Sequence, residues 1–183
     1  MQPWAAAQYQ SIRRGITNPV QQPPDEFDPW LNCFPPGVTR MLIFPRPFEI
    51  RQLPDVLLML FETDHWVRRV YLDGRGHPDG YPITWLGHST GEWNGDSLIV
   101  DTVGINDKTW IDNLGHPHTD ALHLLERYQR VRQDTLEVQF TIDDPKAYTR
   151  PWTGKKVYQL MPPGYEVMEH VICEEHLELG KKR

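Results

Sequence analysis

Residues 121–142, ALHLLERYQRVRQDTLEVQFTI, carry the clearest structural signal in the chain. In the second half, residues 135–142, every other side chain is apolar and the residues between are Thr, Glu, Gln and Thr. A period of two predicts a β-strand with one buried face. Residues 121–131 predict a second strand, and Gln133-Asp134 supplies the turn. The stretch therefore predicts an antiparallel hairpin.

Similar short runs rich in Val, Ile, Leu, Tyr, Phe and Trp lie on both sides of this hairpin, from Met41 onward. Short turn-forming links separate them, and Asn94-Gly95 is the clearest link because both residues tolerate a positive φ. Consecutive strands without intervening helices predict an antiparallel meander that closes into a lipocalin-like β-barrel of eight to nine strands, since closure removes free edges. The other expected strands are residues 47–52, 55–62, 66–72, 83–92, 96–102, 155–161 and 165–173.

The N-terminal part has a different composition. Residues 2–16 predict a short helix, because they contain three consecutive alanines and a proline that suits the first turn. Residues 17–40 hold six prolines and predict an irregular arm that runs over the surface. We therefore expect a helix and arm over 1–40, packed on a barrel domain over 41–183.

One link is much longer than the others. Residues 103–120, VGINDKTWIDNLGHPHTD, connect two expected strands and carry Trp110 and several aliphatic side chains. Long connections in compact domains are usually functional or disordered, and disordered ones seldom carry such residues. This segment is therefore predicted to be an ordered flap over one barrel mouth.

The overall composition excludes several classes of protein. The chain has 183 residues, 11% of them aromatic, with 19 Lys and Arg against 25 Asp and Glu. An aromatic-rich chain of this length predicts one folded domain. A formal charge of -6 disfavours binding to nucleic acid, which requires a basic surface. The longest apolar run, residues 56–61, is too short to be inserted across a bilayer.

Two further features concern the ends of the chain. Cys33 and Cys173 are too far apart for a CxxC motif, so they are either two buried thiols or one disulfide. The first residues, MQPW, have neither the basic start nor the apolar stretch of a signal peptide.

Several motifs resemble a widespread family of usually exported bacterial proteins. They are GEWNGDSLIVDTVGINDKTW over residues 91–110, GHPH and ALH within 115–123, ERY at 126–128, and IDDPKAYT at 142–149. The resemblance implies a periplasmic or secreted protein, but it supplies no catalytic residues. The pattern Gly91-x-Trp93 is also similar to that of lipocalin-like barrels.

Glu126 stands out because it shares the apolar face of its strand. A carboxylate that points into a barrel needs a partner or takes up a proton. One reading is an ion pair with Arg68 or Arg69, supported by a tyrosine hydrogen bond. The other is a carboxyl with a raised pKa that moves a proton on a ligand, while Tyr71 and Tyr128 stabilise an oxyanion.

The histidines offer a second kind of chemistry. His116, His118, His123 and Glu126 lie within 11 residues of one another, and imidazole and carboxylate are common metal ligands. On a strand, however, positions 123 and 126 face opposite ways. The alternatives are therefore a metal site, hydrogen bonds that hold the flap, and acid–base catalysis.

Together these features favour a cofactor-independent acid–base enzyme of the lyase, isomerase, cyclase or hydratase type, acting on a small apolar or aromatic molecule in a barrel cavity. A non-catalytic small-molecule-binding barrel and a metal-dependent enzyme are the alternatives, and a homodimer is left open. Asp101 leads into the flap and either positions it or takes part in catalysis. The candidate catalytic residues are Glu126, Tyr128, Tyr71, Asp101, His116 and His118, and the candidate substrate-binding residues are Arg69, Trp110, Phe140 and His123.

Overall fold

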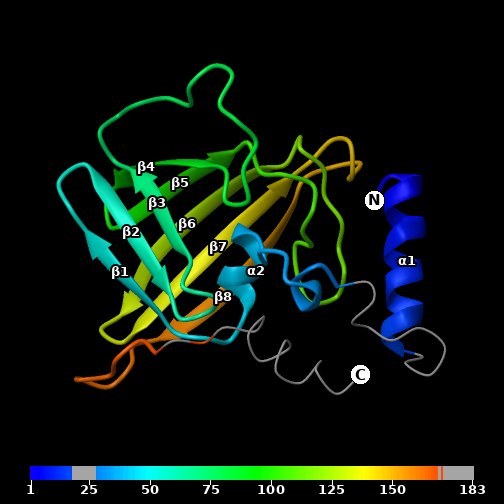
Figure 1. Cartoon of the computed structure of the whole chain (residues 1–183). Coiled ribbons are helices and arrows are strands. Elements are labelled where there is room, and N and C mark those ends of the chain that lie inside the picture. Colours follow the sequence, from blue (N-terminus) through cyan, green and yellow to red (C-terminus); the bar gives the residue numbers. More distant parts are fainter. Residues whose placement is uncertain (18–27, 169, 171–183) are drawn as a thin grey trace.

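The computed structural model describes residues 1–17, 28–168 and 170. Its main element is an eight-stranded sheet with the strands in chain order, curled into a half-barrel (Figure 1). The expected mainly β, barrel-like fold is confirmed. The strands are β1 (Phe48–Gln52), β2 (Val56–Phe61), β3 (Val67–Tyr71), β4 (His88–Asn94), β5 (Ser97–Val103), β6 (His123–Arg132), β7 (Thr135–Asp143) and β8 (Trp152–Gln159).

Neighbouring strands are antiparallel except β3 and β4, which pair in parallel. The expectation of a wholly antiparallel meander is wrong at this point. Residues 72–87 form a second long link and return the chain to the starting end of β3, as a parallel pair requires. The β4–β5 turn consists of Gly95 and Asp96, because Asn94 pairs with Ser97, and Gly95 has a φ of 58°.

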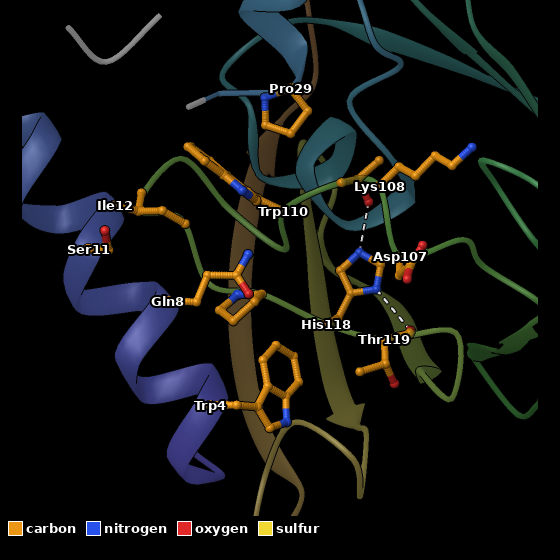
Figure 2. A pocket seen from close by; sticks show the side chains of 12 residues that line it. Trp4, Gln8, Ser11, Ile12, Pro29, Asp107, Lys108, Trp110, His118 and Thr119 are labelled. Carbon is orange, nitrogen blue, oxygen red and sulfur yellow. Dashed lines mark hydrogen bonds between the residues drawn. The ribbon is translucent and has the colours of Figure 1, made fainter. Parts of the chain in front are cut away.

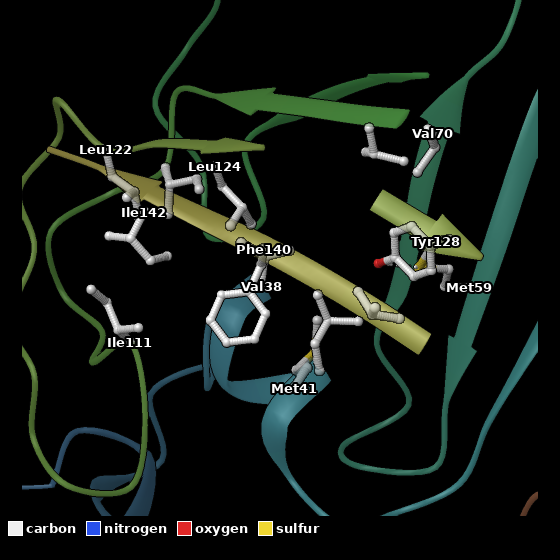
Figure 3. Packing of buried hydrophobic residues seen from close by; sticks show 14 of the residues in the cluster. Val38, Met41, Met59, Val70, Ile111, Leu122, Leu124, Tyr128, Phe140 and Ile142 are labelled. Carbon is white, nitrogen blue, oxygen red and sulfur yellow. Dashed lines mark hydrogen bonds between the residues drawn. The ribbon is translucent and has the colours of Figure 1, made fainter. Parts of the chain in front are cut away.

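A short helix, α2 (Val38–Ile43), lies across the open side of the half-barrel (Figure 1). Val38 and Met41 are buried and face the same core as Phe140 of β7 (Figure 3). The expected surface arm is therefore wrong for residues 38–40, because they begin α2 and are buried between the sheet and its neighbouring loops. Tyr158 and Lys156 of β8 donate hydrogen bonds to carbonyl oxygens of its last residues.

The N-terminal helix α1 (Pro3–Thr17) confirms the helix expected over 2–16. It packs on loops at one end of the sheet rather than on the sheet itself (Figure 1). The Gln2 amide donates to the Ala147 carbonyl at 2.7 Å, and the Trp4 indole donates to the Lys146 carbonyl at 2.8 Å. No helix within the described ranges has the length and apolar character needed to cross a membrane.

The ends of the expected barrel differ from the prediction. Residues 165–168 are not a strand, and the rest of the ninth expected strand lies outside the described residues except for His170, which forms a single bridge with Thr63. The 3₁₀ helix η2 (Trp30–Asn32) precedes Cys33, which is disulfide-bonded. The other cysteine of the chain, Cys173, lies outside the described residues.

Candidate functional site

Glu126 is buried in the half-barrel and paired with Arg68 of β3. Both guanidinium ends contact the carboxylate, one of them at 2.9 Å. Tyr128 donates a hydrogen bond to Glu126 Oε1 at 2.7 Å. Arg68 also donates to the hydroxyls of Thr102 at 2.8 Å and Ser89 at 3.2 Å. Every polar group of this network is therefore satisfied by another part of the protein.

The charges of this network reinforce each other. Burial opposes the charge on Arg68, but the attraction and hydrogen bonds of Glu126 together with those of Tyr128 outweigh it and place the Arg68 pKa above its usual value. Burial, together with the Glu126 charge, raises the pKa of Tyr128 well above its usual value. The structure thus shows the ion-pair alternative for Glu126, with Arg68 as the partner.

Other residues expected around Glu126 do not meet there. Successive side chains of β3 point to opposite faces of the sheet, and Arg68 points inward. Arg69 and Tyr71 therefore lie on the other face. Phe140 is part of the apolar core and fills the space beside Gly154, where an added Cβ would lie 2.3 Å from its ring. The shared oxyanion site of Tyr71 and Tyr128 is therefore not formed.

Asp101 and His123 belong instead to a cluster on the outer face of the sheet, and Tyr71 stacks on its member His88. Asp101 Oδ1 accepts hydrogen bonds from His123 Nε2 at 2.8 Å and from His77 Nε2 at 3.2 Å. His77 Nδ1 lies 2.8 Å from Nδ1 of His88. We call His77, His88, Asp101 and His123 the outer histidine cluster. Sequence reasoning missed His77 and His88, since no spacing rule links them to Asp101.

His116 and His118 separate as well. His116 bonds through Nδ1 to Asp112 Oδ2 at 2.7 Å and stacks on Tyr9 of α1, with ring centroids 4.4 Å apart. His118 lies elsewhere in the flap, and His123 lies in the outer histidine cluster. Across the described part of the chain, no three His, Cys, Asp or Glu side chains are arranged to hold a metal ion. The alternative of a metal site formed by His116, His118 and His123 is therefore wrong. The fold gives each of these histidines a different partner.

A cavity of about 480 Å³ lies between α1 and the long 103–120 link. We call it the α1 crevice. Figure 2 shows side chains of α1 on one side and His118 on the other, with Trp110 above. The α1 side combines the apolar surface of Trp4 and Ile12 with the polar groups of Gln8 and Ser11, and Thr109 and Thr119 lie around His118. The lining includes Trp4, Ile12, Asp107, Thr109, Trp110 and His118.

The hydrogen bonds of His118 fix its tautomer. Nδ1 faces the Thr119 carbonyl oxygen at 3.2 Å, and because a carbonyl only accepts, Nδ1 carries the proton. Nε2 lies 2.8 Å from Thr109 Oγ1. In a neutral imidazole Nε2 then accepts from the Thr109 hydroxyl. Burial lowers the pKa of His118 below its usual value, which favours this neutral form.

Neighbouring groups hold the polar wall in place. Asp144 is buried and accepts from the Thr119 amide at 2.6 Å and from its hydroxyl at 2.9 Å, so it fixes the residue that orients His118. Gly37 lies beside Thr109, where an added Cβ would be 2.6 Å from Oγ1. The room for this hydroxyl thus depends on a glycine at position 37.

Arg40 of α2 supports the aromatic wall. Its guanidinium forms two 2.6 Å bonds to the Asp28 carboxylate and a 2.7 Å bond to the Asn113 side chain. It also lies over the Trp110 ring, 5.7 Å from the centroid. The sequence analysis included Trp110 and His118 but missed Thr109, because nothing in the local sequence distinguishes this threonine from the others.

Comparison of the chain with protein-family models, with curated proteins and with solved structures gives no match.

Proposed function

We propose that the protein is a cofactor-independent acid–base enzyme that acts on a small apolar or aromatic molecule bound in the α1 crevice. The observation that carries the proposal is the Thr109–His118 pair, in which a neutral imidazole accepts a hydroxyl hydrogen bond on a cavity wall. The reaction class is the one that the sequence favours. Its centre lies at His118 rather than Glu126, because the Glu126 oxygens are occupied by Arg68 and Tyr128.

The pair provides a path for one proton. Thr109 Oγ1 takes a proton from the ligand while its own proton passes to Nε2 of His118. The ligand becomes an anion, the imidazole becomes a cation, and Thr109 is unchanged. The carboxylates of Asp144 and Asp107 attract that cation. A general base with a pKa near or below neutrality is suited to this step, because its basic form is available at neutral pH.

The walls of the α1 crevice suggest the ligand class. Trp4, Ile12 and Trp110 provide apolar and aromatic surface, and a 480 Å³ cavity has the size of a small-molecule pocket. Asp107, Thr109 and Thr119 lie around His118, and Gln8 and Ser11 of α1 add polar groups on the opposite side (Figure 2). We therefore propose a ligand with a flat apolar portion against the tryptophans and an acidic C–H or O–H group near Thr109.

Deuterium exchange tests this proposal without a known substrate. A panel of small aryl ketones and aryl-acetic esters is incubated with the protein in D₂O, and deuterium at the carbon beside the carbonyl is followed by mass spectrometry. The wild-type protein should accelerate incorporation into the members that it binds. Thr109→Val and His118→Asn should each reduce this acceleration by about 10²–10⁴, the usual contribution of a general base.

Thr109→Ser is the matched control, because it keeps the hydroxyl and loses one methyl group. It should retain most of the exchange activity. Equal exchange by the wild type and Thr109→Val would contradict the proposal. If some ligands bind to the wild type and not to Trp110→Ala, but none of them exchanges deuterium, the result would support the non-catalytic binding protein instead.

A further inference from the structure

The loop over residues 73–83 covers part of the outer face of the sheet. Side chains added at Gly74, Gly76 or Gly80 would meet no atom within 4 Å, so most of this loop is not packed. Within the described chain, its hydrogen bonds to other segments come from one side chain, His77. Ring contacts add to them: Arg75 lies 4.1 Å from the Tyr71 ring centroid, and Tyr81 and His77 pack edge-on to His88 at 4.7 Å and 5.0 Å.

His88 lies beneath this loop at the start of β4. Only 4% of its surface is exposed, although it projects from the outer face of the sheet. Its ring is stacked on Tyr71, at 5.2 Å between centroids, and is closed in by Tyr81 and His77. The loop therefore buries an imidazole that would otherwise face water.

We propose that His88 is a proton sensor, and that proton uptake by His88 opens the loop over residues 73–83. The inference does not rest on the proposed function. A buried cation is costly, so a protonated His88 favours the state in which water reaches its ring. The other ring that packs on His88, that of Tyr71, belongs to β3 and stays with the sheet, whereas the loop can move away.

The charged groups around His88 point the same way. His77 and Arg75 approach from the loop, with Asp73 paired to Arg75, while Asp101 and His123 approach from β5 and β6. Burial, and then the positive charges of His77 and Arg75, lower the pKa of His88. The charges of His77 and Arg75 arise from the closed loop, and the loop adds to the burial through the rings of His77 and Tyr81. Because binding equilibria are reciprocal, whatever lowers the proton affinity of His88 makes protons favour the open loop.

Two interactions oppose opening. His77 donates from Nε2 to Asp101 at 3.2 Å, and this bond ties the loop to β5. When neutral His77 donates from Nε2 to Asp101, its Nδ1 accepts from Nδ1–H of His88, and a proton on His88 strengthens that bond. A single carboxylate must then serve both His77 and His123, since Asp101 Oδ1 accepts from each. The proposal therefore assigns opening to the proton on His88, and the experiment must separate the two histidines.

Backbone ¹⁵N relaxation of the loop glycines measures opening directly. The order parameters of Gly74, Gly76 and Gly80 should be near 0.85 at pH 7.5 and fall below about 0.6 by pH 5, with a midpoint below 6.5. Gly95, in the β4–β5 turn, is the internal reference and should not change. His88→Phe keeps a ring between Tyr71 and Tyr81 but cannot titrate, so its loop should show no such transition.

Two further variants make the test decisive. His123→Gln keeps a donor to Asp101 and should leave the loop transition in place. His77→Ala opens the loop at all pH values, and the His88 pKa, read from its imidazole ¹⁵N shifts, should then rise toward 6.5. Loop order that is constant from pH 7.5 to 5, a transition that persists in His88→Phe, or a His88 pKa unmoved by His77→Ala would each overturn the proposal.

Discussion

Two buried, hydrogen-bonded pairs of side chains differ in the polar capacity that they leave free. In the half-barrel, Glu126 and Arg68 are held by each other and by Tyr128, Ser89 and Thr102, with no polar capacity left for a ligand. At the α1 crevice, His118 and Thr109 form one neutral hydrogen bond beside a cavity. A buried charge by itself therefore does not mark a reactive group. The remaining hydrogen-bonding capacity and an adjacent space for a ligand do.

Glu126→Gln should have the largest effect on stability. The change leaves the Arg68 guanidinium buried without a counter-charge, and breaking such a pair costs about 3–5 kcal/mol. Urea unfolding should show this loss. The double variant Glu126→Gln with Arg68→Met should regain part of it. A loss of unfolding free energy below about 1 kcal/mol in the single variant would show that water reaches the Glu126–Arg68 pair.

Gly115→Ala should separate α1 from the loop that it packs on. Gly115 has a φ of 87°, and an added Cβ would lie 2.3 Å from Ile12 of α1. The backbone conformation costs about 1–2 kcal/mol, and crowding adds about 1–3 kcal/mol. Gly95→Ala, at a φ of 58° with open space around it, is the control for the backbone term. Equal losses of unfolding free energy in both variants would show that α1 docks loosely.

Thr109→Val should destabilise the protein by about 1–3 kcal/mol, because Nε2 of His118 loses its donor while it stays buried. Thr109→Ser should cost less than about 1 kcal/mol if the hydroxyl keeps its place. Thermal unfolding of the two variants measures the difference. Similar melting temperatures would mean that the 2.8 Å contact adds little, and that the wall of the α1 crevice adjusts.

The smallest expected effect is on the pH dependence of stability. The folded state lowers the pKa of His118, so the unfolded chain binds more protons below pH 6.5. The contribution of this group is complete above pH 6.5 and is lost as the pH falls below it. The lowered pKa of His88 makes stability depend on pH in the same direction, so the His118 contribution is measured as the difference between wild type and a His118 variant. His118→Asn should lose less unfolding free energy than wild type between pH 7 and 5, and an identical profile would contradict the assignment.

Most of the sheet could be predicted, because its signal is local. The alternation over 135–142 and the turn at Gln133-Asp134 correspond to β7 and to its hairpin with β6. The pairing partner of Glu126 could be narrowed to two arginines for the same reason. Strand alternation places one of two neighbouring residues inward, and the structure selects Arg68.

The errors share a different cause. Residues 38–40 follow a proline-rich stretch, and their helix forms because α2 buries Val38 and Met41 against the sheet. The 83–92 strand begins only at His88, since residues 72–87 serve as the crossover to a parallel partner. In both places, burial and chain path override the local composition.

The order of residues along the chain was enough to establish a mainly β protein with a buried acidic side chain at position 126, since period-two alternation acts over a few residues. The meeting of Thr109 with His118, and of His77 with His88 and Asp101, depends on how distant loops pack. No local rule encodes such contacts, because they arise from the path of the whole sheet and its crossovers. Which hydrogen-bonding and titratable side chains meet was therefore decided by long-range packing.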